Sequence, residues 1–356
     1  MKDEYIYAIG LMSGTSLDGL DIVYIKFSNK DLSNFEIVSA ETVDYSNFWS
    51  QKLQNAIQLD EYQISELHHD YGVFLGKETQ NFIRKNSITD LHFIASHGHT
   101  VFHQPEKGIT LQVGDGQQIS NFTNCTVVSD FRTQDVQLGG QGAPLVPIGD
   151  QLLFSEYDAC LNIGGFANIS YKSNEQRIAF DICPVNIVLN YYSRKIGFDY
   201  DDKGECASQG KLDTKLLLAL NDLAFYNITP PKSLGFEWVH QYIFPTIENN
   251  QLELFTVLRT FSEHVAQQIS KTINPFDHVL FTGGGVYNDF IIKKIREYSP
   301  SKIIIPSNTI INYKEALIFT LLGLLKIQGK VNCLSSVTGA KKNHSSGIIF
   351  TPNNRI

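Results

Sequence analysis

The sequence of 356 residues has no basic stripe, no long apolar run and no closely spaced cysteine pair. Its net charge of −8, with no cationic surface to neutralise phosphates, argues against binding of nucleic acid. No run reaches the ~18 apolar residues of a membrane helix, and we find no export signal at the amino terminus. We therefore expect a cytoplasmic protein with a small-molecule ligand and no nucleic-acid or membrane partner.

Several motifs that would name another class of protein are also missing. The five cysteines lack CxxC spacing, which argues against a zinc site or a disulfide framework. No Gly-Lys-Ser/Thr ending indicates a P-loop, and no Gly-x-Ser-x-Gly indicates a serine hydrolase. Hydrophobic residues make up 42% and charged residues 19% of the chain, which is typical of a globular protein with enough length for two cores.

The most informative segment that is present is residues 10–21, Gly-Leu-Met-Ser-Gly-Thr-Ser-Leu-Asp-Gly-Leu-Asp, between two strand-like runs. Gly14 and Gly19 permit positive φ and a close approach of main-chain N–H groups to an anion. The hydroxyls for the same anion come from Ser13, Thr15 and Ser16. Asp18 would repel a bare phosphate, so a magnesium nucleotide fits better. An ordinary hairpin turn has the same composition, and this segment alone leaves that alternative open.

Three further segments favour a nucleotide site. Residues 159–171 repeat the pattern of a strand, a glycine turn at Gly164 and Gly165, and a second strand. Residues 281–289 place a glycine triplet, residues 283–285, between a strand and a helix, but lack the last glycine of the dinucleotide fingerprint. Residues 180–186 place Asp181 at the end of a short apolar run, where open α/β sheets carry their chemistry.

A coarse pass along the chain predicts two α/β domains, residues 1–150 and 151–356, with a strand meander at the head of each and a cleft between them. The expected elements are a meander over 5–44, helices over 47–86, strands at 91–95 and 125–129, a helix at 151–157, a core helix from 252 to 269, a helix at 290–298, a strand at 302–306 and a helix at 314–328.

Taken together, these segments resemble the anhydro-N-acetylmuramic acid kinase family. The resemblance spans almost the whole chain and rests on residues 10–21, 96–105, 111–115, 130–132, 139–147, 162–165, 230–233, 282–285, 315–316 and 338–340. It implies a two-domain, actin-like (ribonuclease H-like) ATPase or sugar-kinase fold with an interdomain cleft, ATP and Mg²⁺ as cofactors, and a homodimer. It also implies ATP-dependent conversion of 1,6-anhydro-N-acetylmuramic acid and water to N-acetylmuramic acid 6-phosphate in murein (peptidoglycan) recycling.

By this resemblance, Asp181 is the general base toward water, and Glu315 positions the water or the sugar. Glu315 also reads as an ordinary first-turn helix carboxylate, and that alternative stays open. Asp18 is the expected magnesium ligand. The nucleotide contacts are expected at Gly14, Thr15, Ser16, Leu17, Asp18, Gly19, Asp21, Gly164, Gly165, Gly283, Gly284 and Gly285.

The resemblance places the sugar at six further residues, Ser96, His97, His99, Asp130, Arg132 and Asn186. Arg132 is suited to the lactyl carboxylate, because a guanidinium meets a carboxylate through two parallel hydrogen bonds. Two other interpretations apply here. The imidazoles of residues 97, 99 and 103 allow a metal site, and Asp130 with Arg132 allows a plain surface ion pair.

One segment departs from the family pattern. Residues 181–186 read Asp-Ile-Cys-Pro-Val-Asn, where the family usually has Asp-Thr-Gly-Pro-Gly-Asn. Positive φ is costly for the β-branched Val185, so we expect either a rebuilt loop or an altered ligand. A kinase for another small sugar derivative, or a non-catalytic ATP- or sugar-binding protein on the same fold, is the alternative function.

Overall fold

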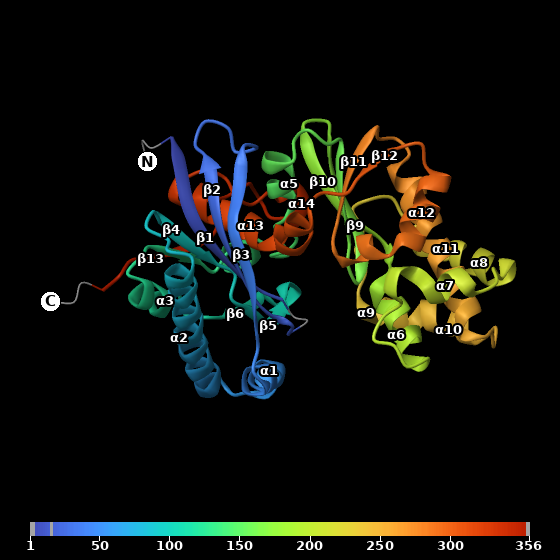
Figure 1. Ribbon diagram of the computed structural model, residues 1–356, viewed down its shortest axis with the longest axis horizontal. Coiled ribbons are helices and arrows are strands. Elements are labelled where there is room, and N and C mark those ends of the chain that lie inside the picture. The colour runs from blue at the N-terminus through green and yellow to red at the C-terminus, as the bar shows by residue number, and fades with distance from the viewer. Residues whose placement is uncertain (1–3, 15–16, 354–356) are drawn as a thin grey trace. The chain divides into compact units, whose positions relative to one another are not determined.

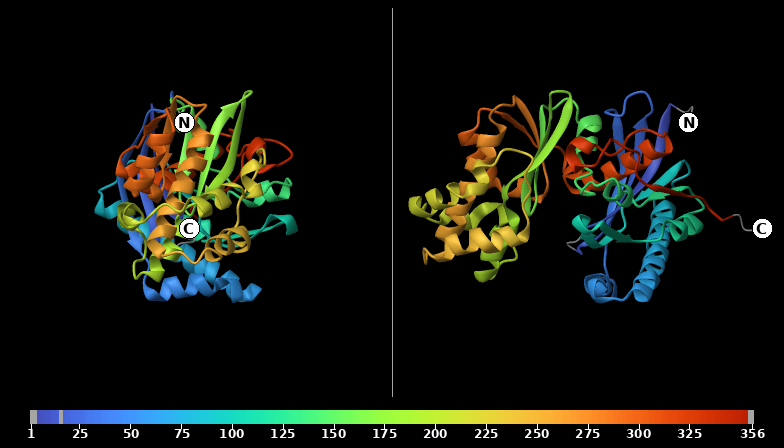
Figure 2. Two further views of the ribbon diagram at one scale, coloured as in Figure 1. Left: turned by 90° about the vertical axis from the view of Figure 1, so that its right-hand side faces the viewer. Right: turned by 180° about the vertical axis from the view of Figure 1, so that it is seen from behind.

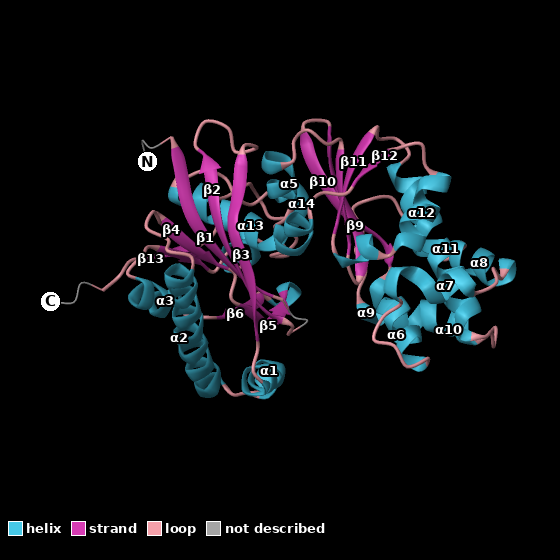
Figure 3. Ribbon diagram, viewed as in Figure 1, coloured by secondary structure: helices cyan, strands magenta, loops and turns pink. Residues whose placement is uncertain are grey.

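The computed structural model describes residues 4–14 and 17–353. It divides into two compact units: unit 1 comprises residues 1–155 and 313–356, and unit 2 comprises residues 156–312. Figure 1 labels the elements and Figure 3 colours them by type. The first boundary lies between residues 155 and 156, whereas the expected one lies between residues 150 and 151. The expectation that residues 151–356 form one domain is wrong for the last part of the chain, because α13 and β13 pack in unit 1.

Unit 1 is built on a six-stranded sheet in the order β13-β7-β4-β1-β2-β3. Strands β1 to β3 form an antiparallel meander, and β4 and β7 run parallel to β1. Strand β13 pairs antiparallel with β7 and forms the edge of the sheet. Its strands are β1 (Tyr5–Ser13), β2 (Gly19–Ser28), β3 (Phe35–Asp44), β4 (Phe93–Ser96), β7 (Val127–Ser129) and β13 (Ile348–Phe350), with a separate pair, β5 (His99–Gln104) and β6 (Ile109–Val113). The predicted meander is confirmed.

Helices cover both faces of the unit 1 sheet (Figure 2). Ile9 and Leu11 of β1 share a buried cluster with Leu67 and Leu75 of α2. On the alternate face, a Cβ at Gly10 would overlap the Thr320 side chain of α13, so the helix approaches the strand closely here. The helices are α1 (Asn47–Gln54), α2 (Glu61–Lys85), α3 (Gly116–Thr123), α4 (Thr133–Gln137), α5 (Pro147–Leu153), α13 (Asn308–Ile327) and α14 (Ser335–Thr338).

Unit 2 repeats the same strand order in its five-stranded sheet, β10-β9-β8-β11-β12. In both units an antiparallel meander of three strands is followed by two strands parallel to the first. The strands are β8 (Ala159–Ile163), β9 (Phe166–Ser173), β10 (Gln176–Pro184), β11 (His278–Thr282) and β12 (Lys302–Ile304). This order is that of a ribonuclease H-like sheet, so the predicted two-part α/β fold class is confirmed.

The helices of unit 2 are α6 (Asn186–Lys195), α7 (Glu205–Gln209), α8 (Thr214–Asn221), α9 (Phe236–Trp238), α10 (Phe244–Glu248), α11 (Leu254–Ile273) and α12 (Asp289–Tyr298). The predicted core helix is α11, which buries Leu258, Phe261, Val265 and Ile269, whereas Phe255 is 39% exposed. In residues 4–14 and 17–353, no helix is both long enough and apolar enough to cross a membrane.

Some predicted boundaries are wrong. The helix expected at 151–157 is α5, which begins at Pro147 because the fixed φ of proline suits the first helical position. The helix expected at 314–328 begins earlier, at Asn308. The strands expected at 91–95 and 125–129 are the shorter β4 and β7.

Candidate active site

The first predicted phosphate turn joins β1 to β2 in unit 1. Thr15 and Ser16 lie outside the described residues, while Leu17 takes a φ of 61° and its N–H donates to the Gly14 carbonyl. Asp18 is exposed beside this turn. The expected positive φ at Gly19 is wrong, since Gly19 is the first residue of β2. Glycine is needed there because a Cβ would lie 2.6 Å from the Val43 carbonyl oxygen.

The second glycine turn, Gly164 and Gly165, joins β8 to β9 in unit 2 as predicted. Its two carbonyls accept hydrogen bonds from the N–H groups of Val185, Asn186 and Ile187, at 2.7, 3.2 and 3.3 Å. These bonds satisfy donors at the start of α6, which would otherwise lack helical partners. The turn and the Asp181–Asn186 segment are therefore one hydrogen-bonded substructure.

The departure from the family pattern is accommodated by packing. Val185 has a φ of −132°, so the steric cost that we expected for a left-handed valine does not arise. Cys183 and Val185 are both fully buried in the core of unit 2. Both side chains therefore fill the core of unit 2.

Asp181 lies inside β10, at a bulge between Asp181 and Cys183, instead of at the end of a strand as predicted. A bulge redirects a side chain and is common beside active sites. Its Oδ2 accepts the Leu234 N–H at 2.8 Å, and its N–H donates to the Lys232 carbonyl at 3.1 Å. Burial raises the pKa of Asp181, and the Leu234 hydrogen bond opposes the rise. Among the described residues, Oδ1 has no hydrogen-bond partner and is left to accept a proton.

The predicted glycine triplet joins β11 to α12, through a short helix at Gly284–Tyr287. Gly283 has a φ of 85°, and a Cβ there would lie 2.6 Å from the Ile163 carbonyl oxygen. A Cβ at Gly285 would overlap the Ile163 side chain, whereas one at Gly284 would meet nothing within 4 Å. The outer two glycines serve packing on β8, and the middle one leaves open main chain beside it.

In unit 1, the parallel neighbours β4 and β7 bring the segments that follow them to one edge of the sheet. There His97 Nε2 accepts hydrogen bonds from Nε and Nη2 of Arg132, at 3.0 and 2.9 Å. His97 Nδ1 donates to the Gly98 carbonyl at 2.9 Å, so the ring is neutral with Nε2 as acceptor. Burial, with Arg132 beside it, holds the pKa of His97 well below its usual range.

This arrangement argues against both alternative interpretations of the segment, a metal site at the imidazoles and a surface ion pair between Asp130 and Arg132. His97 Nε2 is occupied by Arg132, and the part of the chain that the structure describes holds no metal-type cluster at residues 97, 99 and 103. Asp130 makes no ion pair with Arg132 within the same part, and it accepts the Thr133 N–H at 3.3 Å instead. Arg132 also donates from Nη1 to the Gly142 carbonyl at 2.6 Å. Of its five N–H groups, two remain, one on each terminal nitrogen.

A chain of hydroxyls orients the second imidazole. His99 Nδ1 lies 3.1 Å from Ser13 Oγ, Ser13 accepts from Tyr45 at 2.7 Å, and Tyr45 lies 2.5 Å from the Tyr71 hydroxyl. Ser13 Oγ thus lies between the Tyr45 hydroxyl and the imidazole and hydrogen-bonds both. Burial lowers the pKa of His99 to about 4. Sequence reasoning missed Tyr45 and Tyr71, which read as ordinary core aromatics.

The other predicted sugar residues take no part in the hydrogen bonds described above for His97, His99 and Arg132. Ser96 is fully buried, and its Oγ has no hydrogen-bond partner among the described residues. Asn186 begins α6 in unit 2. His103 Nδ1 lies 3.1 Å from Thr110 Oγ1 on the exposed β5-β6 pair.

A group of carboxylates and cations lies near Glu315 of α13 and includes Asp21, Arg132 and Lys314. Asp21 Oδ1 accepts from Thr42 Oγ1 at 2.6 Å, and burial, with Asp18 adding to it, raises the pKa of Asp21. Glu315 keeps solvent access, yet the surrounding protein raises the pKa of its carboxyl, while Arg132 opposes the rise. Glu315 is a member of this charged group, several residues into α13, which makes the first-turn alternative wrong.

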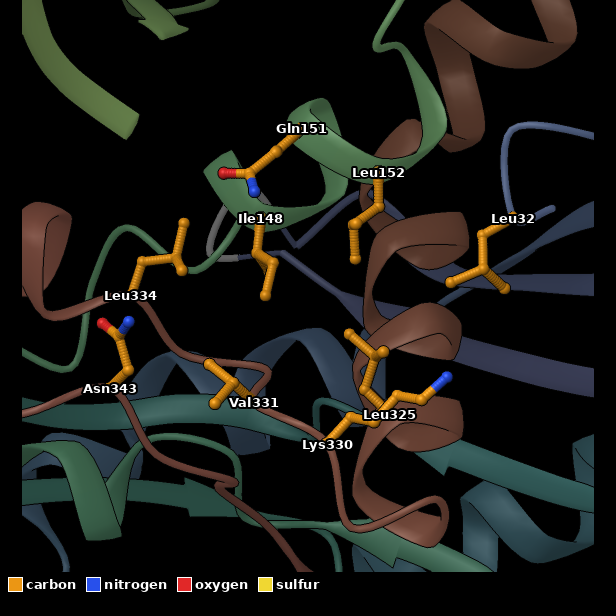
Figure 4. Close-up of a pocket in the computed structure, with 9 residues that line it drawn as sticks. All are labelled: Leu32, Ile148, Gln151, Leu152, Leu325, Lys330, Val331, Leu334 and Asn343. Atoms are coloured by element: carbon orange, nitrogen blue, oxygen red, sulfur yellow. The ribbon is translucent and has the colours of Figure 1, made fainter. Parts of the chain in front are cut away.

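A pocket of about 370 Å³ lies elsewhere in unit 1 (Figure 4). It is lined by Leu32, Ile148, Gln151, Leu152, Leu325, Lys330, Val331, Leu334 and Asn343. The lining is mostly apolar and includes none of the predicted site residues. We therefore assign no role in the chemistry to this pocket.

Comparison with known proteins identifies the family of the chain. A family model described as anhydro-N-acetylmuramic acid kinase matches residues 6–352. The chain is similar to proteins of that description from Francisella tularensis subsp. novicida (32% identity over 95% of this chain and 97% of the relative) and Pasteurella multocida (33%, over 98% of each). A third, from Vibrio cholerae, is 33% identical over 99% of this chain and all of the relative. The chain belongs to the anhydro-N-acetylmuramic acid kinase family.

Proposed function

We propose that the protein uses ATP to convert 1,6-anhydro-N-acetylmuramic acid and water to N-acetylmuramic acid 6-phosphate. The observation that carries the proposal is Asp181, a partly buried carboxylate with a raised pKa, one oxygen fixed by a main-chain N–H and the other available. A general base works best when its pKa is raised toward the working pH and its orientation is fixed. Family membership supplies the substrate.

In the proposed reaction, Asp181 accepts a proton from water as the water oxygen attacks the anomeric carbon. The bond from that carbon to the bridging oxygen breaks, and the freed oxygen forms a bond to the γ-phosphorus of ATP while ADP leaves. Phosphoryl transfer needs both the acceptor oxygen and the triphosphate to be held in line. We assign the triphosphate to the turns at residues 14–19 and 164–165, and the nucleoside to the triplet at residues 283–285.

The groups of unit 1 suit the sugar. Arg132, with one N–H left on each terminal nitrogen, is proposed to bind the lactyl carboxylate, and His99 to hydrogen-bond a sugar hydroxyl through Nε2. Glu315 is proposed to position the water or the sugar. For Ser96, Asp130 and Asn186 the role in sugar binding rests on the family resemblance alone.

Magnesium fits the residues near the first turn. Asp18 is an exposed carboxylate whose charge raises the pKa of Asp21, and a divalent cation would relieve that repulsion. We propose that Asp18 binds Mg²⁺, which neutralises charge on the triphosphate when bound. We also propose a homodimer in the cytoplasm, on the family resemblance alone, which size-exclusion chromatography with light scattering and cell fractionation would test.

The test is formation of ADP and 6-phosphosugar by the purified protein from Mg²⁺-ATP and the anhydro sugar. Turnover that is lost in Asp181→Asn and retained in the exposed control Asp222→Asn supports the proposal. Turnover of free N-acetylmuramate or another sugar in place of the anhydro sugar would contradict the assigned substrate. ATP binding without any turnover would contradict an enzymatic role.

A further inference from the structure

A cluster of buried polar side chains lies in unit 1 outside the groups assigned to the reaction. It joins three residues that are far apart in the sequence: Asp135 of α4, Cys333 in the segment after α13, and His344. Asp135 is fully buried, Cys333 is 1% exposed and His344 is 6% exposed. One ligand-type atom of each, the carboxylate oxygen, Sγ and an imidazole nitrogen, lies within 4.8 Å of the others.

The histidine of this cluster has an unused nitrogen that points into it. His344 Nδ1 lies 3.2 Å from the Lys342 carbonyl oxygen, to which it donates. In the neutral ring, Nε2 therefore carries a lone pair. Nε2 is buried, lacks a hydrogen-bond partner within the described residues, and lies 3.6 Å from Asp135 Oδ1. A metal-binding histidine characteristically donates its other N–H to a carbonyl or carboxylate in this way.

We propose that Asp135, Cys333 and His344 form a zinc site. Zinc prefers sulfur, imidazole and carboxylate ligands in tetrahedral geometry. Bond lengths of about 2.3 Å to sulfur and ~2.0 Å to nitrogen and oxygen put tetrahedral ligand atoms roughly 3.3–3.5 Å apart. Oδ1 lies 3.0 Å from Sγ and 3.6 Å from Nε2, so these two spacings need to change by only about 0.5 Å, and Sγ and Nε2 lie within 4.8 Å of each other.

Zinc binding would leave the buried site with no net charge. The Cys333 thiol, which donates to Asp135 without metal, loses its proton to solvent as the bond from sulfur to zinc forms. One thiolate and one carboxylate then neutralise Zn²⁺, which removes the cost of a net charge in a buried site. The fourth position falls to the Thr338 hydroxyl, which lies 2.7 Å from Asp135 Oδ1, or to water.

The site would act through a residue of the proposed sugar pocket. Asp135 Oδ2 accepts the Gly142 N–H at 2.7 Å, and the Gly142 carbonyl accepts from Arg132 Nη1. Gly142, whose carbonyl orients the guanidinium, is thus held through its N–H by a proposed zinc ligand. Zinc would have a structural role, fixing α4 and the segment of residues 333–344 around Arg132.

The experiment uses untagged full-length protein, treated with a chelator, exposed to Zn²⁺ or Co²⁺ and freed of unbound metal by gel filtration. We expect about one equivalent of zinc by mass spectrometry, a near-ultraviolet charge-transfer band from thiolate to Co²⁺, and a higher Tm with zinc. Cys333→Ser and His344→Gln should lose the metal and the band. The matched control Cys125→Ser, at a partly exposed free thiol, should keep both.

Two results would overturn the site. One is wild-type protein that retains no zinc; the other is metal retention and a cobalt band that survive Cys333→Ser. If a variant fails to fold, the wild-type metal content and cobalt spectrum still decide the question. These readouts are independent of sugar and ATP, so their failure leaves the proposed kinase reaction unaffected.

Discussion

His97 Nε2 accepts two hydrogen bonds from Arg132, one from Nε and one from Nη2. The imidazole thereby occupies one side of the guanidinium, and with Nη1 bonded to the Gly142 carbonyl, one N–H on each terminal nitrogen is left for another partner. Because the ring must stay neutral to accept these bonds, its tautomer is fixed by the Gly98 carbonyl on the other side. The geometry of a cation in the proposed sugar pocket is thus set by a histidine that needs no contact with sugar.

Arg132→Lys should weaken sugar recognition selectively. Lysine keeps the charge but loses the planar fork, so one charge-assisted hydrogen bond disappears, worth about 1.5–3 kcal/mol. We expect kcat/KM for the anhydro sugar to fall by ~10- to 100-fold, with little change in KM for ATP. Steady-state kinetics of this variant beside the exposed control Arg84→Lys would measure it; an equal loss for both substrates would argue against carboxylate binding.

The pH profile of kcat/KM should have an acidic limb that depends on the ionisation of Asp181. A general base works only when deprotonated, and burial raises the pKa of Asp181 from its ordinary value. The rate should therefore fall as pH decreases through that raised pKa. Asp181→Asn should lower kcat by about 10²- to 10⁴-fold while ATP still binds. A pH profile of kcat/KM with an unshifted limb near pH 4 would contradict this assignment.

His99 should make thermal stability depend on pH. Its pKa is about 4 in the folded protein and about 6.5 in the unfolded chain, so the unfolded chain binds more protons between these values. The contribution of neutral His99 to the free energy of unfolding is complete above pH 6.5 and is lost as pH falls toward 4. Its size is on the order of 3 kcal/mol.

Calorimetry would check this prediction. The drop in Tm between pH 7 and pH 5 should be smaller in His99→Gln than in the wild type, and unchanged in His278→Gln, whose side chain is 52% exposed. The same slope in all three proteins would exclude His99 as the titrating group.

The glycine triplet should divide into two classes. Gly285→Ala forces a Cβ into the Ile163 side chain, and overpacking of this kind costs about 1–3 kcal/mol, which should lower the midpoint of urea unfolding. Gly284→Ala meets open space and should keep the wild-type midpoint. If the triplet contacts the nucleoside, Gly284→Ala should nevertheless weaken ATP binding, which calorimetric titration would measure. Unchanged affinity would contradict that role.

The segment of residues 181–186 should contribute to stability as part of the hydrophobic core of unit 2. Val185→Ala removes buried methyl groups and should cost about 2 kcal/mol of unfolding free energy. The exposed control Val38→Ala in β3 should cost much less. Equal effects in denaturant titrations would mean that Val185 does not pack as described.

Local patterns in the sequence predicted the local parts of the fold. Alternating residues indicated the meander of β1 to β3, and helical spacing indicated α11. The meeting of Tyr45 with Ser13, and of Asp135 with Cys333 and His344, left no such signal, because periodicity reports the burial of a residue but not its partner. Val185 was misjudged for the same reason: a glycine position in relatives says nothing about the φ of a substituted loop. The assigned roles of the site residues stay predictions.

Unit 2 is one continuous segment, whereas unit 1 is made from two pieces of chain on either side of it. A ribosome therefore completes residues 156–312 before most of α13 and all of β13 exist. Until then, the face of β1 around Gly10 has no helix to cover it, and β7 remains an open sheet edge. The first part of the chain to be synthesised is thus the last to reach its native state, so nascent unit 1 should depend most on chaperones.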